Sequence, residues 1–553
     1  MTGVAEGQAT RANRVKNMSS KEWLCILGLL GLILSGGAAR TQTGSPSPIA
    51  ERCQALETAD FSKVPDLLAS VTKTEMVDSR DAARSYCEVT GYLAPSIGFT
   101  LRLPAFNWNG KFMEVGCGGL CGTLSHISAC DDPLRRGYAC IVSDGGHTAG
   151  FLDGKWAYNN LSAKVDLFVR AAHVSALAGK ELTERYYRVK PRKAYFWGCS
   201  GGGSQAMQEA QRFPWDFDGI IAGAAITWSS TELYYLWVIR ALTDGAGKPI
   251  LAQSDLDILH RAVLEQCDLN DGVRDGVIGD PRACQFDPSV LACSANKNTP
   301  CLTAKQITAV KKVYAGPTTS SGDPIPLMAP AALPGSERGW SLYSNPMIVS
   351  YVEEMFRYVN VFQPDPGPMW NLEDFDFDRD YKRLGMAVNL LEPSNPDLRR
   401  FEAAGGKLLH YAGWNDVLNP TLGDVDYYES AERLIGDRAR VQNFYRLFVV
   451  PGMDHCTGGE GVFAVDYLSY LEAWVEKGEP PEKLIGSHVG LKQQDPRGQQ
   501  DPHGQQDPHG LMHFPLDPRS IEFSRPIYPY PVRTRYLGHG NPNSAESFGP
   551  EKP

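Results

Sequence analysis

The stretch "YFWGCSGGGSQ", residues 195–205, decides how this chain is expected to fold. It begins with aromatic residues typical of a buried strand and then places four glycines around Ser200. Gly198, Ser200 and Gly202 match G-x-S-x-G, a turn so sharp that the serine is held above the end of a sheet. The next residues, "SQAMQEAQRFP", predict a helix that stops before Pro214. Strand, tight turn and helix are the context that this motif requires, although a flexible glycine-rich loop is the alternative on this stretch alone.

Length and composition place the chain among ordinary globular proteins. Its 553 residues can form one large core with an inserted domain, or about three ordinary domains. Hydrophobic residues make up 42% and charged residues 21% of the chain. The formal net charge is −10 and no long basic cluster occurs, so we expect no nucleic acid partner.

Residues 1–39 have the features of a secretory signal peptide. An apolar run, "LCILGLLGLIL", is followed by the small residues "SGGAAR", which predicts cleavage after Ala39. The run is too short for a comfortable membrane span, so we expect no stable membrane insertion after cleavage, with a retained anchor as the alternative. The protein is therefore predicted to be secreted or periplasmic. The basic residues that precede the run are Arg11, Arg14, Lys16 and Lys21.

Export changes the interpretation of the thirteen cysteines. With Cys25 inside the predicted signal peptide, an even number remains in the mature chain. In an oxidising compartment an even number of cysteines predicts disulfides. Their spacings are not the paired C-x-x-C of a zinc ribbon, so a zinc site is not expected.

Two further strand–loop segments supply an acid and a base in the order that α/β-hydrolases use, which is serine, acid, histidine. "YRLFVVPGMDHC" is a strand followed by a loop that carries His455, and "GGKLLHYAGWNDVLNP" is a strand followed by a loop that carries Asp416. His410 lies inside the second strand and is expected in the core. Asp454 is too close in sequence to His455 to orient its ring. We therefore predict a catalytic triad of Ser200, Asp416 and His455.

Cysteines adjoin two members of this predicted triad. Cys199 precedes Ser200, and Cys456 follows His455. If the nucleophile and the base meet in space, these cysteines can meet too, and a disulfide would tie the turn to the histidine loop. A triad loses rate steeply when its parts shift by about 1 Å, so such a bond would have a mechanical use. The alternative is that each cysteine pairs elsewhere, because spacing alone cannot fix connectivity.

The Cys-Ser, Asp and His-Cys elements resemble those of the tannase and feruloyl esterase family. Further matching stretches are "NGKFMEVGCGGLCG", "VSDGGH", "RFPWDFDGIIAGAA" and "CDLNDGVRDG", and the resemblance runs from about Cys53 to Phe548. It implies an α/β-hydrolase fold, the same three triad residues and the disulfide Cys199–Cys456.

The negative oxygen that develops during ester cleavage needs backbone N–H donors. One donor should be Gly201, the residue after the nucleophile. The other is expected on the early loop "MEVGCGG", because glycines let a backbone approach a ligand closely. The resemblance places this second donor at Gly118, and the alternative is that the loop merely turns.

The segment between the serine and the aspartate is much longer than a plain hydrolase core needs. We therefore predict an α/β-hydrolase fold with a large inserted lid domain, residues 227–398. The core would comprise residues 40–226 and 399–553. The latter part contains "QQDPRGQQDPHGQQDPHG", residues 493–510, a repeated hexapeptide that predicts a disordered surface insertion because it has no apolar face to bury.

The predicted lid holds an aspartate-rich loop, "CDLNDGVRDGVIGDPRAC". Hard oxygen ligands packed in a loop suit Ca²⁺ better than a transition metal, although the spacing is not that of an EF-hand. The resemblance assigns the side chains of Asp268, Asp271 and Asp275 and the backbone carbonyls of Val273 and Val277 as ligands. Such a site would be structural, and the alternative is a solvated Asp/Gly turn.

Other cysteine pairs follow from the loop and from the resemblance. Cys267 and Cys284 bracket the aspartate-rich loop and are expected to pair. The resemblance adds Cys53–Cys87 and Cys293–Cys301. Four cysteines beside the predicted oxyanion loop have no assigned pairing; they are Cys117, Cys121, Cys130 and Cys140.

These features together predict a secreted serine carboxylic-ester hydrolase that acts on small esters of aromatic (phenolic) acids through an acyl-enzyme. It would need structural Ca²⁺ and no organic cofactor. The alternatives are another ester or amide substrate, or a catalytically silent ligand-binding homologue, which the intact triad argues against. An aromatic-rich stretch, "YSNPMIVSYVEEMFRYVNVFQPDPGPMW", could clasp an aromatic acyl group or form the core of the lid. Asn419 stands at a position that faces substrate in relatives, and the particular ester and the oligomeric state are open.

Overall fold

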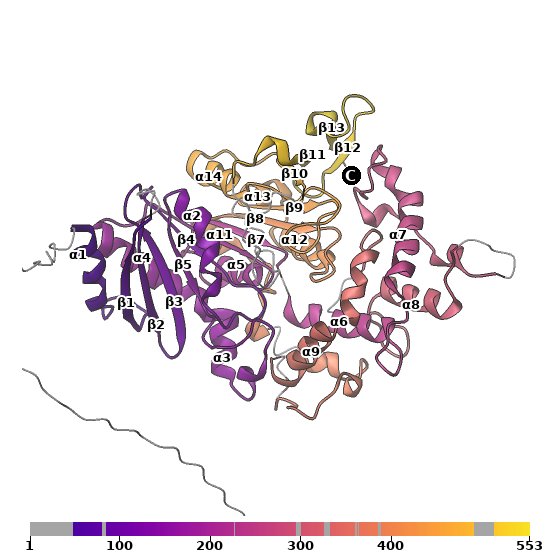
Figure 1. Ribbon diagram of the computed structural model, residues 1–553, viewed down its shortest axis with the longest axis horizontal. Coiled ribbons are helices and arrows are strands. Elements are labelled where there is room, and N and C mark those ends of the chain that lie inside the picture. Colours follow the sequence, from indigo (N-terminus) through magenta and orange to yellow (C-terminus); the bar gives the residue numbers. More distant parts are fainter. Residues whose placement is uncertain are drawn as a thin grey trace, which may run out of the picture. The chain divides into compact units, whose positions relative to one another are not determined.

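A nine-stranded mixed sheet organises the fold (Figure 1), with the strand order β1-β2-β3-β5-β4-β6-β7-β8-β9. The pairs β1–β2, β2–β3 and β3–β5 are antiparallel, and every pair from β5 to β9 is parallel. The strands are β1 (Ala69–Val77), β2 (Tyr86–Leu93), β3 (Ile97–Pro104), β4 (Lys111–Val115), β5 (Ala139–Ser143), β6 (Lys193–Cys199), β7 (Gly219–Gly223), β8 (Lys407–Gly413) and β9 (Tyr445–Val450).

This computed structural model describes residues 48–79, 85–225, 227–294, 300–325, 332–359, 362, 364–384, 389–490 and 514–552. The predicted signal peptide and the hexapeptide repeat lie outside these residues. None of the helices within them is both long and apolar enough to cross a membrane.

Helices cover both faces of the sheet, as alternation along its strands dictates. On one face Phe196 and Ile220 pack in the same buried cluster as residues of α4, α5 and α12. On the other face their neighbours Tyr195 and Ile221 pack with α14. Because both faces are covered, the parallel strands are buried and read as continuous apolar runs.

The helices of the core are α1 (Pro48–Gln54), α2 (Asp131–Arg135), α3 (Leu161–Val165), α4 (Ala171–Tyr187), α5 (Gly201–Arg212), α11 (Arg399–Ala403), α12 (Thr421–Ile435), α13 (Arg438–Gln442) and α14 (Tyr467–Lys477). Two small antiparallel sheets follow the main one, formed by β10 (Leu484–Val489) with β11 (Ile521–Ile527) and by β12 (Arg533–Tyr536) with β13 (Phe548–Glu551).

The long segment between β7 and α11, here called the insertion, adds no described strand to the main sheet. Its buried side chains form a hydrophobic cluster that is rich in aromatic residues and also takes in residues of the core such as Leu120 and Leu167. Its described helices include α6 (Trp228–Leu242), α7 (Gln253–Cys267), α8 (Ala304–Ala315), α9 (Pro346–Glu354) and a 3-10 helix, Glu337–Ser344. The insertion corresponds to the predicted lid, whose boundaries at 227 and 398 stay predictions.

All four disulfides expected from the sequence are formed, and they are Cys53–Cys87, Cys199–Cys456, Cys267–Cys284 and Cys293–Cys301. The four cysteines left unassigned pair locally, as Cys117–Cys121 and Cys130–Cys140. Sequence spacing could not choose between the possible pairings of four cysteines so close together.

Candidate active site

The predicted strand–turn–helix motif is present at Ser200. β6 ends at Cys199, α5 begins at Gly201, and Ser200 between them has a positive φ of 61° with ψ −123°. This backbone conformation is costly for a residue with a side chain and persists where the surroundings enforce it. Here the N–H of Ser200 donates to the carbonyl of Gly223 at 3.0 Å. A Cβ at Gly198 would collide with the carbonyl of Gly202, so the turn requires glycine there.

The predicted acid and base meet. His455 Nδ1 lies 2.7 Å from Asp416 Oδ2, and the carboxylate accepts the ring N–H. The other oxygen of Asp416 accepts the backbone N–H groups of Leu418 and Asn419, each at 2.8 Å. Asp416 is buried, and these bonds fix its orientation. With Nδ1 protonated toward Asp416, Nε2 of His455 is the nitrogen that can accept a proton.

The disulfide Cys199–Cys456 joins the residue before Ser200 to the residue after His455, with the two Cα atoms 6.0 Å apart. Both cysteines are buried. The bond therefore brings the loop that follows β9 to the turn that follows β6.

The glycine loop after β4 lies against the first turn of α5. Gly116 donates to the carbonyl of Trp197 at 2.9 Å, and the N–H of Cys117 donates to Gln205 Oε1 at 3.1 Å. A Cβ at Gly201 would collide with the carbonyl of Gly119. In the described part of the chain, the N–H of Gly118 has no acceptor, whereas its carbonyl accepts from Cys121. The two predicted oxyanion donors therefore lie on adjoining backbone segments.

Comparison with known proteins identifies the family to which this architecture belongs. The family model described as "Tannase and feruloyl esterase" matches residues 81–550. The chain belongs to the tannase and feruloyl esterase family. A mono(2-hydroxyethyl) terephthalate hydrolase from Piscinibacter sakaiensis is 31% identical to it, over 91% of this chain and 92% of that protein. An uncharacterised esterase from Xanthomonas campestris is 30% identical, over 85% and 84% of the two chains.

Solved structures agree. A feruloyl esterase B from Aspergillus oryzae superposes with a TM-score of 0.75 and 25% identity, over 90% of this chain and all of that one. A tannin acyl hydrolase from Aspergillus niger, at 20% identity and a TM-score of 0.68, shares the fold. The chain has the α/β-hydrolase fold and is a carboxylic ester hydrolase of this family.

The insertion of this esterase contacts the loop that carries Asp416, here called the acid loop. Local sequence patterns did not reveal this contact. The hydroxyl of Tyr235 donates to the carbonyl of Leu418, and that of Tyr343 donates to the carbonyl of Val417. Both tyrosines lie in the buried core of the insertion. The hydroxyls thus reach the two residues that directly follow Asp416.

The aromatic-rich stretch of the insertion is largely core. Tyr343, Tyr351, Phe356 and Phe362 are all buried in the hydrophobic cluster of the insertion. The core interpretation therefore holds for these residues, and the alternative of a substrate clasp is wrong for them. Their packing explains the composition of the stretch.

A buried polar chain lies behind the acid loop. Asn419 is only 2% exposed, and its amide donates to Asp424 at 2.8 Å. His410 Nε2 lies 2.9 Å from the other oxygen of Asp424, and His410 Nδ1 lies 2.9 Å from the hydroxyl of Tyr445. The prediction that His410 is a core residue is confirmed. The side chain of Asn419 is engaged in this chain of bonds, unlike a residue that faces a ligand.

The aspartate-rich loop directly follows α7. Burial and the negative charges of Asp275 and Asp268 raise the pKa of Asp271 to about 7, although a bond from the Val273 amide opposes this. A divalent cation would relieve that repulsion, and the all-oxygen donor set suits Ca²⁺. However, Asp275 pairs with Arg525 at 2.6 Å.

The carboxylate oxygens of the three aspartates do not all lie within 4.8 Å of one another, so Ca²⁺ would have to draw them together. Among the described residues, only His173, Glu209 and Asp216 form a group of three such ligand atoms within 4.8 Å of one another. In that buried group, the ammonium of Lys180 donates to the carbonyl of Asp216 and supplies positive charge. The calcium ligands, Val273 and Val277 included, stay a prediction.

We expect the Cys199–Cys456 bond to matter for rate as well as for stability. Changing both cysteines to alanine removes a cross-link that closes a loop of 257 residues, worth about 5 kcal/mol in the chain-entropy model. In addition, kcat should fall at temperatures where the double variant is still folded, because the histidine loop can then drift from Ser200. Kinetics on an ester substrate, combined with thermal unfolding, measure both effects.

The matched control is the pair Cys293→Ala/Cys301→Ala, which removes a disulfide that lies within the insertion and away from the triad residues in sequence. It should lower stability and leave kcat nearly unchanged. A folded Cys199→Ala/Cys456→Ala enzyme with wild-type kcat would mean that this bond serves stability alone.

Proposed function

We propose that this esterase cleaves its substrate with a serine nucleophile and an acyl-enzyme intermediate. The observation that carries the proposal is the bond between His455 Nδ1 and Asp416, in a loop that a disulfide joins to the Ser200 turn. His455 Nε2 would take the proton of Ser200 as the hydroxyl attacks the ester carbonyl, and would then give it to the leaving alcohol. Water activated by His455 would release the acid in the second half of the cycle.

Asp416 would hold the imidazole in the correct tautomer and stabilise its charged form. The backbone N–H groups of Gly201 and Gly118 would stabilise the negative oxygen of the tetrahedral intermediates. Both lie where the glycine loop meets the first turn of α5. As backbone groups in a packed environment, they need no reorganisation when the charge develops.

The proposed substrates are small esters of aromatic acids. Relatives in the family include a mono(2-hydroxyethyl) terephthalate hydrolase and a feruloyl esterase. In this chain Phe168 and Trp228 line a small pocket that borders Gly119 and Gly201. Both side chains are buried in the hydrophobic cluster of the insertion. The aromatic acyl preference is therefore proposed from the relatives, and an aromatic lining next to the proposed oxyanion donors agrees with it.

We also propose that the protein is exported. Six disulfides join all the cysteines outside the predicted signal peptide, and disulfides persist in oxidising compartments. The basic, apolar and small-residue pattern of residues 1–39 would direct that export.

Substitution of the proposed triad tests the mechanism. Ser200→Ala or His455→Ala should lower kcat by about 10⁴-fold or more, because both residues act as one unit. The fold should be retained, since neither change removes a buried apolar side chain. Steady-state kinetics measure the loss of kcat, labelling by a fluorophosphonate measures the reactivity of Ser200, and thermal unfolding checks the fold. Purified Ser200→Ala protein with wild-type activity would contradict the assignment.

A substrate panel tests the acyl preference. We expect kcat/KM for methyl ferulate, methyl gallate or a terephthalate monoester to exceed that for methyl acetate by at least about tenfold, since even one methylene of contact in a hydrophobic pocket is worth roughly 1–3 kcal/mol. A short p-nitrophenyl ester serves as the general activity control. Equal or better turnover of methyl acetate would exclude aromatic specificity.

Calcium dependence tests the aspartate-rich loop, which we propose binds Ca²⁺ as a structural ion through Asp268, Asp271 and Asp275. A ligand that binds only the native state raises stability by about 2.7 kcal/mol at 100 times its Kd. The melting temperature should therefore fall on chelation and recover with Ca²⁺. Asp268→Ala should abolish this response as well as lowering stability, because Asp268 also accepts two backbone N–H groups. A wild-type melting temperature insensitive to Ca²⁺, with none found by elemental analysis, would leave the loop as an ordinary turn.

A further inference from the structure

The loop that carries His455 folds back on itself as a hairpin. Side chains of the insertion contact its second arm, here called the return arm. The N–H of Gly461 donates to the carbonyl of Gly452 at 2.9 Å, and Met453 and Gly459 form a β-bridge across the loop. His455 and Cys456 therefore lie near the tip, and Glu460 lies on the return arm. The disulfide holds the tip, while the side chain of Glu460 contacts residues of the insertion.

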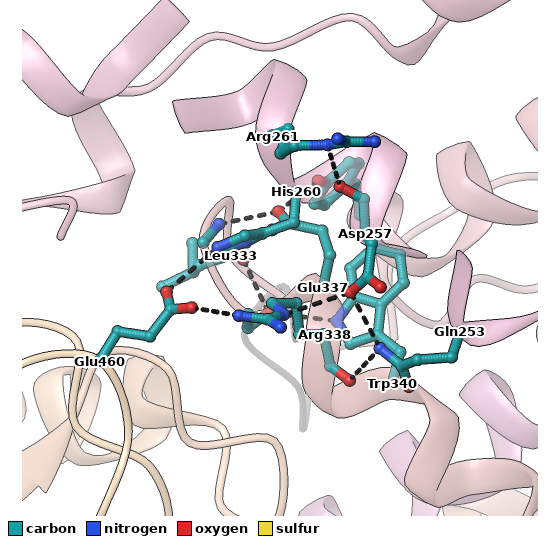
Figure 2. Close-up of polar contacts among 12 residues, drawn as sticks. Gln253, Asp257, His260, Arg261, Leu333, Glu337, Arg338, Trp340 and Glu460 are labelled. Carbon is teal, nitrogen blue, oxygen red and sulfur yellow. Dashed lines mark hydrogen bonds and ion pairs between the residues drawn. The ribbon is translucent and has the colours of Figure 1, made fainter. Parts of the chain in front are cut away.

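His260 of α7 lies between two carboxylates. Its Nδ1 is 2.9 Å from Glu337 Oε2 in the insertion, and its Nε2 is 3.1 Å from Glu460 Oε2 in the histidine loop. Figure 2 shows the imidazole between these two side chains. The side chain of His260 is 5% exposed and that of Glu337 is fully buried. Glu337 is itself held by the hydroxyl of Tyr314 and the N–H of Gly335, each at 2.7 Å.

A second cation of the insertion reaches the same carboxylate. Arg338 donates to the other oxygen of Glu460 at 2.7 Å, and its Nε donates to Asp257 at 3.2 Å (Figure 2). Both oxygens of Glu460 are thus occupied by donors from the insertion. Because Arg338 is more than half exposed, its ion pair adds less than the buried contact of His260.

These charges keep His260 protonated. Burial alone would lower the pKa of His260, but hydrogen bonds to Glu337 and Glu460 outweigh it and raise the pKa to about 9. Burial would raise the pKa of Glu460, but the bonds from His260 and Arg338 outweigh it and lower the pKa. An imidazolium that donates from both nitrogens makes two charge-assisted hydrogen bonds, which are stronger than neutral ones.

We propose that His260 is a positioning residue. Its imidazolium binds Glu460 to the insertion and thereby holds His455 in the correct position relative to Ser200. This inference rests on the proposed function, because it assumes that His455 is the base. Glu460 would then give the histidine loop an ionic anchor in addition to the covalent one at Cys456. Loss of the ionic anchor would let the return arm shift, and a shift of about 1 Å in a catalytic group can cost about 10²-fold in rate.

Glu460→Ala tests the ionic anchor. We expect kcat to fall by about tenfold or more with KM changed by less than about threefold, because positioning of the base affects chemistry more than binding. Glu460→Gln, which keeps an acceptor for His260, should recover part of the loss. The side chain of Glu460 is 34% exposed, so these variants should fold even if His260→Gln does not.

The matched control is Glu402→Ala. Glu402 on α11 forms a comparable ion pair with Arg440, at 2.8 and 2.7 Å, and is 24% exposed. Its removal should leave kcat unchanged. If His260→Gln folds, the double variant His260→Gln/Glu460→Ala should be no slower than Glu460→Ala, because the two residues act through one contact.

The pH dependence of kcat distinguishes positioning by His260 from a purely structural role of this residue. The folded-state pKa of His260 is raised, so its contribution is present at neutral pH and is lost as the pH rises through about 9. We expect wild-type kcat to decline across that range and the decline to be absent from Glu460→Ala. The charged and titratable groups around His260 and Glu460 are Glu337, Arg338, Tyr314, Asp257, Arg261 and Asp454.

The outcomes separate this inference from the proposed mechanism. Activity in Ser200→Ala or His455→Ala would refute the mechanism and the inference with it. If those variants are inactive while Glu460→Ala and Glu402→Ala have the same kcat, the mechanism stands and the ionic anchor is refuted. An equal loss of kcat and melting temperature in Glu460→Ala and Glu402→Ala would likewise refute positioning.

Discussion

The bond between Cys199 and Cys456 spans a gap that the sheet itself creates. In the strand order β6-β7-β8-β9, the strand that ends at the serine and the strand that leads to the histidine are three spacings apart. At the usual spacing this is about 14 Å, so the histidine loop must reach back across the ends of β8 and β7. Loops of that reach are mobile unless they are tied down. The disulfide fixes the part of the histidine loop that lies next to the end of β6, and the position of His455 depends on this bond.

The intermediate strand supplies a second tie. Asp416 follows β8, so it lies on the path of the histidine loop, and the N–H of Asn415 donates to the carbonyl of Met453 at 3.1 Å. Tyrosine hydroxyls of the insertion hold the backbone just after Asp416. The acid and base loops are therefore bonded to each other and, separately, to the insertion. The geometry of the proposed active site is shared between the core and the insertion.

Local sequence patterns predicted the parts of this arrangement that are local. Ser200, Asp416 and His455 each follow a short apolar strand, and such strand–loop segments carry their own signature. The helix after Ser200 begins at Gly201, earlier than expected. Its first residues are glycines, whose poor helix propensity hid the start, but the close approach of the carbonyls of Gly119 and Gly223 requires glycine at positions 201 and 203. The contacts of Tyr235 and of His260 join residues far apart in sequence, and nothing in the neighbourhood of either residue predicts its partner. Burial likewise decided between core and clasp for the aromatic stretch, and composition alone could not.

The insertion's contacts with the acid and histidine loops limit how freely it can be exchanged within the family. A module that touched its scaffold only through the ligand could be exchanged without disturbing the catalytic loops. Here the module also carries hydrogen-bond donors for the backbone at Val417 and Leu418 and for the side chain of Glu460. An insertion transferred from a relative without matching hydrogen-bond donors would disturb the acid and histidine loops. Sequence divergence of the insertion should therefore proceed by substitutions in which its loop-holding residues and their partners change together.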